Sequence, residues 1–256
     1  MKALILNSGT GSRMGDIKTC KCMVEITPGK TIIGEQIRRL TQCGITRICV
    51  TTGPYAEILE TYLHNQHPEV HFEFIHNPLY NETNYIYSIF LARAQLQEDI
   101  LLIHGDLVFE TALLREVLSF SRSCMVIDTT KPLPDKDFKA VIKDGIITSI
   151  GVNFFESAVY AQPLYKLLWP DWRLWLDEVI RLCKMGNTGI YAENALNAVN
   201  NDANTHLNNN SNVCGNSNTN NKINIFPLDA RGQICFEIDN ADDLAYARDV
   251  YKKCNS

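Results

Sequence analysis

The sequence predicts an α/β fold built on a doubly wound, mostly parallel mixed sheet. Strand-like and helix-like runs alternate as βαβαβαβ through residues 2–104, which is the order typical of parallel sheets. Two of the strands, 2–6 and 99–104, are nearly continuous apolar runs, as expected when helices cover both faces. Glycine or polar residues follow several strands, at the sheet edge where folds of this kind bind ligands.

Each element of the first half follows from its local pattern. A helix at 31–43 places Ile33, Ile37 and Leu40 on one face, and Gly44 ends it. Residues 45–52 are β-branched and strand-like, and Gly53-Pro54 breaks the run. The other predicted elements are helices at 55–65 and 83–96 and strands at 70–75 and 99–104.

The pattern changes at residue 129 and predicts a small α+β lobe at 129–199. Residues 138–150 resemble a hairpin that turns at Asp144-Gly145, and helices are predicted at 158–168, 172–183 and from 193. Residues 225–239 are again strand-like, and Asn240 with Asp243 starts a final helix. We expect a single domain over residues 1–256.

An asparagine-rich stretch at 200–224 interrupts this pattern. Asparagine, serine and threonine dominate it, and it holds almost nothing that a core could bury. Because burial cannot offset the entropy lost on ordering such a segment, we expect a disordered surface insertion without a functional role.

Composition excludes several classes of protein. With 45% hydrophobic and 21% charged residues, the chain has the make-up of an ordinary globular protein. The net charge of -5 argues against a nucleic-acid partner. No apolar run is long enough for a membrane span and the start lacks a signal-peptide core, so we expect a cytoplasmic protein without a membrane partner. Nine scattered cysteines, with one Cys-x-Cys pair at Cys20 and Cys22, favour reduced thiols over a zinc site.

The glycine-rich loop at 7–15 predicts a phosphate-binding site. It follows the first strand, and Gly9 and Gly11 leave backbone N–H groups open to a polyphosphate, with charge supplied by Arg13 and Lys21. The spacing does not fit a dinucleotide fingerprint, because the third glycine comes one place late at Gly15. A tight turn without a ligand is the structural alternative.

Two aspartates at strand ends predict a metal site. Asp106 follows the strand 99–104, and Asp239 ends a second strand-like run. Carboxylates beside a bound triphosphate suit Mg²⁺, which takes one or two protein carboxylates and completes its shell with phosphate oxygens and water. Each aspartate alone could instead cap a loop or a helix.

Two further polar groupings are less specific. Asn84 and Ser88 lie four apart at a predicted helix start and could pair with a nucleobase edge, although their spacing alone favours helix capping with core packing of Tyr85 and Tyr87. Trp172 with Glu193 could hold a cationic amine, although Trp172 and Trp175 have the spacing of core residues. A Gly-x-Ser-x-Gly elbow is absent from the sequence, which argues against nucleophilic hydrolysis.

Together these motifs resemble the nucleoside-triphosphate transferase family, and within it the choline-phosphate and 2-aminoethylphosphonate cytidylyltransferases. The loop 6–14, Lys21, the run 83–88, Gly105-Asp106 and Glu237-Ile238-Asp239 are similar to the family's motifs. Cys20 stands where many members have proline, and Tyr85 replaces an asparagine. The resemblance implies a Rossmann-like nucleotidyltransferase sheet, with the 129–199 lobe on the acceptor side.

The resemblance also implies a role for each site residue. Lys21 and Arg13 would be catalytic, and Asp106 and Asp239 would bind Mg²⁺. The acceptor would contact Lys139, Glu193 and Trp172. The implied nucleotide-binding residues are Leu6, Asn7, Ser8, Gly9, Gly11, Ser12, Gly53, Asn84, Ser88 and Asp106.

The implied activity is that of an Mg²⁺-dependent cytidylyltransferase in phosphonate biosynthesis. It would convert CTP and 2-aminoethylphosphonate into CMP-2-aminoethylphosphonate and pyrophosphate, because residues 104–110, 136–142 and 191–195 look most like enzymes with that acceptor. Phosphocholine and sugar 1-phosphates are alternative acceptors. A non-catalytic nucleotide-binding regulator is a further alternative, opposed by the intact Lys21, Asp106 and Asp239. A homodimer is compatible with the sequence.

Overall fold

The structure is a computed structural model that describes residues 1–11, 19–209 and 222–254. Of the predicted site residues, Ser12 and Arg13 lie outside these ranges. Within the described residues, no helix combines the length and the apolar character needed to cross a membrane.

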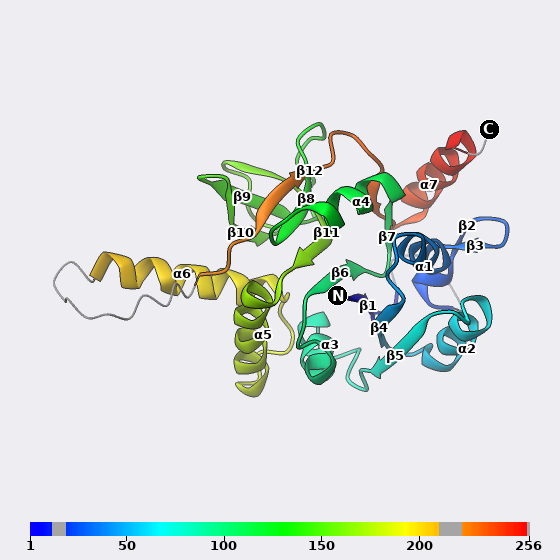
Figure 1. The fold of residues 1–256 in the computed structure, drawn as a ribbon, viewed down its shortest axis with the longest axis horizontal. Helices are drawn as coiled ribbons and strands as arrows, with labels where there is room; N and C mark the ends of the chain where they lie inside the picture. The colour runs from blue at the N-terminus through cyan, green and yellow to red at the C-terminus, as the bar shows by residue number, and fades with distance from the viewer. Residues whose placement is uncertain (12–18, 210–221, 255–256) are drawn as a thin grey trace.

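A mixed sheet organises the molecule, as predicted (Figure 1). Its order is β10-β9-β11-β6-β1-β4-β5, with β8 attached beside β11 and β12 beside β8. The parallel half consists of β1 (Lys2–Asn7), β4 (Arg47–Thr52), β5 (His71–His76) and β6 (Ile100–His104). The strand β1 lies between β4 and β6, so its carboxyl end opens in the middle of this half.

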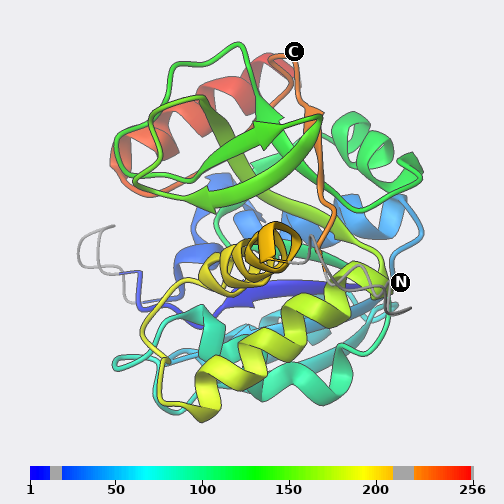
Figure 2. The same ribbon diagram turned by 90° about the vertical axis from the view of Figure 1, so that its left-hand side faces the viewer.

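Helices cover both faces of the sheet. Side chains from one face of β1, β4 and β6 pack with α3 (Tyr85–Ala92), α5 (Trp169–Lys184) and α6 (Glu193–Asn209). The opposite face packs with α1 (Ile32–Gln42), α2 (Ala56–Gln66) and α4 (Thr111–Ser119). Figure 2 shows α5 and α6 side by side across the first of these faces. This two-sided cover explains why β1 and β6 are almost entirely apolar.

The second half of the sheet is antiparallel around β11 (Ala158–Leu167). This strand pairs with β6, β8 (Cys124–Asp128) and β9 (Lys139–Lys143), and β12 (Phe226–Asp229) adds to β8. The predicted hairpin is confirmed as β9 and β10 (Ile146–Gly151), and both Asp144 and Gly145 have the positive φ angles of its turn.

The prediction of a helix at 158–168 is wrong, because this segment is the strand β11. Pro163 lies in its middle and would break a helix, since it has no N–H and clashes with the preceding turn. In the sheet, the pairing of β11 with β8 shifts register between Ala161 and Tyr165, which accommodates the proline. Sheet pairing on both edges decides the conformation here.

Two small sheets hold the segments around the site. The strand β7 (Leu107–Phe109) pairs antiparallel with β13 (Cys235–Glu237), and β2 (Glu25–Thr27) pairs with β3 (Lys30–Thr31). The N–H of Ile238 donates to the carbonyl of Asp106 at 3.0 Å. This pairing brings the end of β13 beside the end of β6.

The final helix α7 (Ala241–Cys254) begins as predicted. The side chain of Asn240 accepts hydrogen bonds from the N–H groups of Asp242 and Asp243, and Asp243 accepts in return from the N–H of Asn240. This reciprocal cap fixes where the chain turns after β13.

The structure describes both ends of the asparagine-rich stretch, residues 200–209 and 222–224. The helix α6 continues to Asn209, and both Asn200 and Ile223 are buried. The Asn200 side chain joins the two ends, because it donates to the carbonyl of Thr148 and accepts from the N–H of Ile223. Residues 210–221 lie outside the described ranges, so disorder there stays a prediction.

Candidate active site

A cavity of about 410 Å³ opens at the carboxyl ends of β1 and β6. The glycine loop, both predicted metal ligands and residues of the second half of the chain all contribute to its wall. Its lining includes Leu6, Asn7, Ser8, Gly9, Thr10, Gly11, Lys21, Asn84, Tyr85, Gly105, Asp106, Lys136, Asp137, Tyr191 and Asp239. Nine of the residues predicted from sequence therefore meet at one cavity.

Lys21 joins the two aspartates at the floor of this cavity. Its ammonium nitrogen lies 2.7 Å from Asp106 Oδ2 and 2.6 Å from Asp239 Oδ1. Burial by itself would lower the pKa of Lys21, but the two carboxylates outweigh it and raise the pKa. Burial would likewise raise the pKa of Asp106, yet Lys21 and His104 lower it. Both groups are therefore charged at neutral pH.

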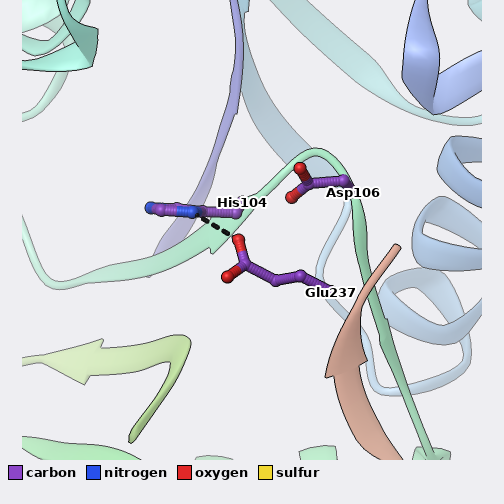
Figure 3. Close-up of side chains that lie close together, drawn as sticks. All are labelled: His104, Asp106 and Glu237. Carbon is purple, nitrogen blue, oxygen red and sulfur yellow. Dashed lines mark hydrogen bonds and ion pairs between the residues drawn. The ribbon is translucent and has the colours of Figure 1, made fainter. Parts of the chain in front are cut away.

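A second ion pair lies beside Asp106 (Figure 3). His104 Nδ1 and Glu237 Oε1 are 2.9 Å apart. Burial would lower the pKa of His104, but Glu237 raises it to about 9. Burial and the charge of Asp106 raise the pKa of Glu237 to about 7. The sequence prediction did not assign this pair, and its only signal was the position of each residue two places before a predicted metal ligand.

The side chains around Asp106 offer ligand atoms that fit a divalent cation. Asp106 and Asp239 direct carboxylate oxygens to one point, where the Lys21 ammonium now lies. One ligand atom each from His104, Asp106 and Glu237 also lies within 4.8 Å of the others. Hard carboxylate oxygens suit Mg²⁺. Asp106 and Asp239 together supply two carboxylates to one point, whereas Glu237 is paired with His104.

Glycines let the backbone pack tightly around the cavity. Gly11 has φ +67°, and a Cβ there would lie 3.0 Å from the Cβ of Lys21. A Cβ on Gly105 would lie 2.6 Å from Asn7 Oδ1, and one on Gly53 would lie 2.3 Å from the carbonyl oxygen of Ser8. Gly53 does not line the cavity, so its part is to let β4 end directly against the glycine loop.

The two residues predicted to read a nucleobase lie in different settings. Asn84 lines the cavity, and its side-chain oxygen caps α3 by accepting from the N–H of Tyr85. Ser88 is fully buried outside the cavity lining, because α3 turns it inward. Its hydroxyl lies 2.7 Å from that of Ser8 and accepts from the amide of Asn77. Ser88 therefore orients Ser8 rather than touching a ligand.

The predicted acceptor residues do not line the cavity. Trp172 is a core residue whose indole N–H donates to the carbonyl of Leu96, so the core alternative is correct. The buried ammonium of Lys139 donates to the carbonyls of Asp135, Asp137 and Val152. With three backbone acceptors around it, Lys139 braces the loop before β9 instead of facing a phosphonate.

Glu193 is also buried, and its carboxylate accepts from the hydroxyls of Tyr85 and Tyr165. Both oxygens are thereby engaged, so Glu193 positions the Tyr85 ring instead of binding an ammonium group directly. Charge and residue type suggested a ligand contact from sequence, but only the hydrogen bonds from Tyr85 and Tyr165 reveal this role.

Aromatic rings form one wall of the cavity. Tyr85, His104, Phe138 and Tyr191 contact one another in a closed circuit, with ring centroids 5.0 to 6.2 Å apart. All four line the cavity, near the carboxylates of Asp137 and Glu237. An aromatic wall beside carboxylates suits a small organic cation. Sequence reasoning missed this wall, since its rings come from four separate segments.

Comparisons with known proteins agree with this geometry. The family model described as a MobA-like NTP transferase domain matches residues 3–132. A curated relative named CMP-5'-(3-aminopropyl)phosphonate synthase, from Streptomyces rubellomurinus, is 27% identical over 135 residues. That match covers 52% of this chain and 21% of the relative, so the chain spans only about a fifth of the length of that protein.

Solved structures share the fold over almost the whole chain. The CTP:phosphocholine cytidylyltransferase from Streptococcus pneumoniae has a TM-score of 0.72 at 18% identity, and the match covers 98% of each chain. The inositol-1-phosphate CTP transferase from T. maritima has a TM-score of 0.75 at 17% identity, covering 98% of this chain and 95% of the other. At such identity the likeness establishes the fold alone.

Proposed function

The chain belongs to the MobA-like NTP transferase domain family, and on that premise we propose that it is a cytidylyltransferase. The proposed reaction joins the CMP part of CTP to 2-aminoethylphosphonate and releases pyrophosphate. One observation carries the proposal: a half-buried lysine and two carboxylates from distant segments meet beside a glycine loop at the carboxyl ends of parallel strands.

In the proposed reaction, a phosphonate oxygen of the acceptor attacks the α-phosphorus of CTP. The bond to the β-phosphate oxygen breaks, and pyrophosphate leaves. The protein's work is placement and charge neutralisation. Backbone N–H groups around Gly9 and Gly11 would cradle the phosphates, and Lys21 would neutralise charge on the α-phosphoryl group. Arg13, proposed from its sequence position, would hold the departing pyrophosphate.

Asp106 and Asp239 would hold Mg²⁺ in this reaction. When bound, the ion would offset the negative charge of the triphosphate. The Lys21 ammonium, which now bridges the two aspartates, would then turn from them toward the α-phosphate. Asn84 would contribute to selecting cytosine, and Ser8, held by Ser88, would contact the nucleotide.

The proposed acceptor follows from the positive charge of its ammonium group. Its ammonium end would lie against the ring wall of Tyr85, Phe138 and Tyr191, near Asp137 and Glu237. The name of the Streptomyces relative supports a phosphonate acceptor. The ring wall favours a second candidate, phosphocholine, because a trimethylammonium gains most from aromatic faces.

A pyrophosphate-release assay tests the proposal. It crosses the four nucleoside triphosphates with 2-aminoethylphosphonate, phosphocholine and glucose 1-phosphate, with Mg²⁺ present. We expect release only with CTP, and fastest with 2-aminoethylphosphonate. Faster release with phosphocholine would select the second candidate, and faster release with the sugar phosphate would exclude both. No release with any pair would favour a non-catalytic nucleotide-binding protein.

A further inference from the structure

Two thiols flank Lys21 and touch each other. Cys20 Sγ and Cys22 Sγ are 3.3 Å apart, on either side of the residue that bridges Asp106 and Asp239. Both belong to the short turn that begins the segment Lys21–Met23, for which Cys20 is the N-cap. The seven cysteines whose side chains the structure describes, Cys20 and Cys22 among them, are free thiols, and within this set only these two form a sulfur–sulfur contact.

The surroundings of the pair suit oxidation. Cys22 lines the cavity and its sulfur lies 3.3 Å from that of Cys20, so a small solute in the cavity comes within one side chain of Cys20, although both residues are buried. The hydrogen bond from Cys22 lowers the pKa of Cys20 to about 7, whereas burial raises the pKa of Cys22 well above its ordinary value. Cys20 is thus the thiolate that attacks, and Cys22 keeps a proton to give away.

We propose that Cys20 and Cys22 form a disulfide when a peroxide enters the cavity, and that this bond withdraws Lys21 from the two aspartates. The Cys20 thiolate attacks one peroxide oxygen, the O–O bond breaks, and the leaving hydroxide takes a proton to become water. Cys22 then attacks the sulfur of the Cys20 sulfenic acid, the S–O bond breaks, and its thiol proton leaves with the hydroxide as a second water.

The geometry links this bond to Lys21. The sulfurs must approach from 3.3 Å to about 2.05 Å, so the turn that carries Lys21 must tighten. Cys20 Sγ also accepts a hydrogen bond from Asn7 Nδ2 and donates one to Asn7 Oδ1. In the disulfide, the sulfur carries no proton and can no longer donate to Asn7. Since Gly11 packs against the Cβ of Lys21, movement of the turn disturbs the glycine loop as well.

Trypsin reads out the disulfide directly, because it cleaves after Lys21, between the two cysteines. The intact protein is treated with hydrogen peroxide, its free thiols are alkylated in denaturant, and it is digested without reductant. We expect peptides 19–21 and 22–30 to remain joined, and to separate after dithiothreitol. Cys49→Ser should form the link equally well, and Cys22→Ser should not form it. Alkylated peptides 19–21 and 22–30 from the treated protein would overturn the proposal.

The effect on Lys21 is measured separately. Pyrophosphate release should fall in step with the linked peptide and return with dithiothreitol, whereas peroxide should leave the residual rate of Cys20→Ser unchanged. Release that persists in fully linked protein would refute the withdrawal of Lys21. Because peptide mapping needs no activity, a protein that fails the proposed cytidylyltransferase assay still tests the disulfide.

Discussion

Lys21 and Asp239 are separated by 218 positions in the chain, yet their side chains meet at 2.6 Å. The pairing of β13 with β7 and the cap of α7 place Asp239 there, and the turn after the glycine loop places Lys21. Asp106 accepts from the same ammonium, so one cation holds together three segments of the chain.

Replacement of Lys21 by alanine should separate catalysis from binding. We expect kcat to fall about 100-fold or more, the usual effect of losing one donor to transition-state charge. The affinity for CTP should change by less than about 10-fold, because the backbone cradle remains. Steady-state kinetics and CTP titration measure the two effects, with Lys30→Ala on the exposed strand β3 as control. Equal losses in both would make Lys21 a binding residue only.

Asp239→Asn should raise the Mg²⁺ requirement. The variant keeps the size of the side chain but loses a charged oxygen ligand, so half-maximal activity should need about 10-fold more Mg²⁺ or more. A titration of activity with MgCl₂ at saturating CTP measures this. Asp242→Asn, in the first turn of α7 and exposed, should behave like the wild type. An unchanged Mg²⁺ optimum in Asp239→Asn would assign the metal elsewhere.

Gly11→Ala and Gly29→Ala form a matched pair. Both glycines have positive φ, so either substitution should destabilise the protein by about 1 kcal/mol. Only the Gly11 methyl group meets another residue, at 3.0 Å from Lys21, whereas nothing lies within 4 Å of the Gly29 position. Turnover should therefore fall in Gly11→Ala alone. Chemical denaturation and kinetics compare them, and similar turnover in both variants would contradict contact between the loop and Lys21.

Glu193→Ala should reduce stability. It leaves the hydroxyls of Tyr85 and Tyr165 without their shared acceptor, at a cost of about 1–3 kcal/mol for each buried group. Urea denaturation measures the loss, and Glu156→Ala at an exposed turn is the control. A variant of full stability whose KM for the acceptor alone rises would restore the direct role in ammonium binding.

The pair His104 and Glu237 should make stability fall as the pH rises. Folding raises the pKa of Glu237 from 4.5 to about 7 and that of His104 from 6.5 to about 9. Because the folded protein binds these protons more tightly, the two groups contribute fully to the free energy of unfolding at low pH. This contribution is lost as the pH rises from about 4.5 to 9. Chemical denaturation across this pH range should show that the free energy of unfolding declines less steeply with pH in the double variant His104→Gln, Glu237→Gln than in the wild type. Parallel curves would contradict the assignment.

Local patterns predicted most of the parallel half and the phosphate side of the site. An apolar run, a glycine loop and a helix cap each act over a few residues, so β1, α1 and the Asn240 cap could be read directly. The strand β11 could not be read from periodicity, although Pro163 was the available signal. Its conformation depends on strands that are distant in the chain.

The amino-acid sequence by itself determined the α/β class and the glycine loop, and it predicted that Lys21, Asp106 and Asp239 belong to one site. The tertiary structure decided which polar groups face the cavity. Glu193, Lys139 and Ser88 have suitable chemistry but turn into the protein, where tyrosine hydroxyls, carbonyls and Ser8 engage them. Residue type fixes what a side chain can bind, whereas long-range packing fixes what it meets.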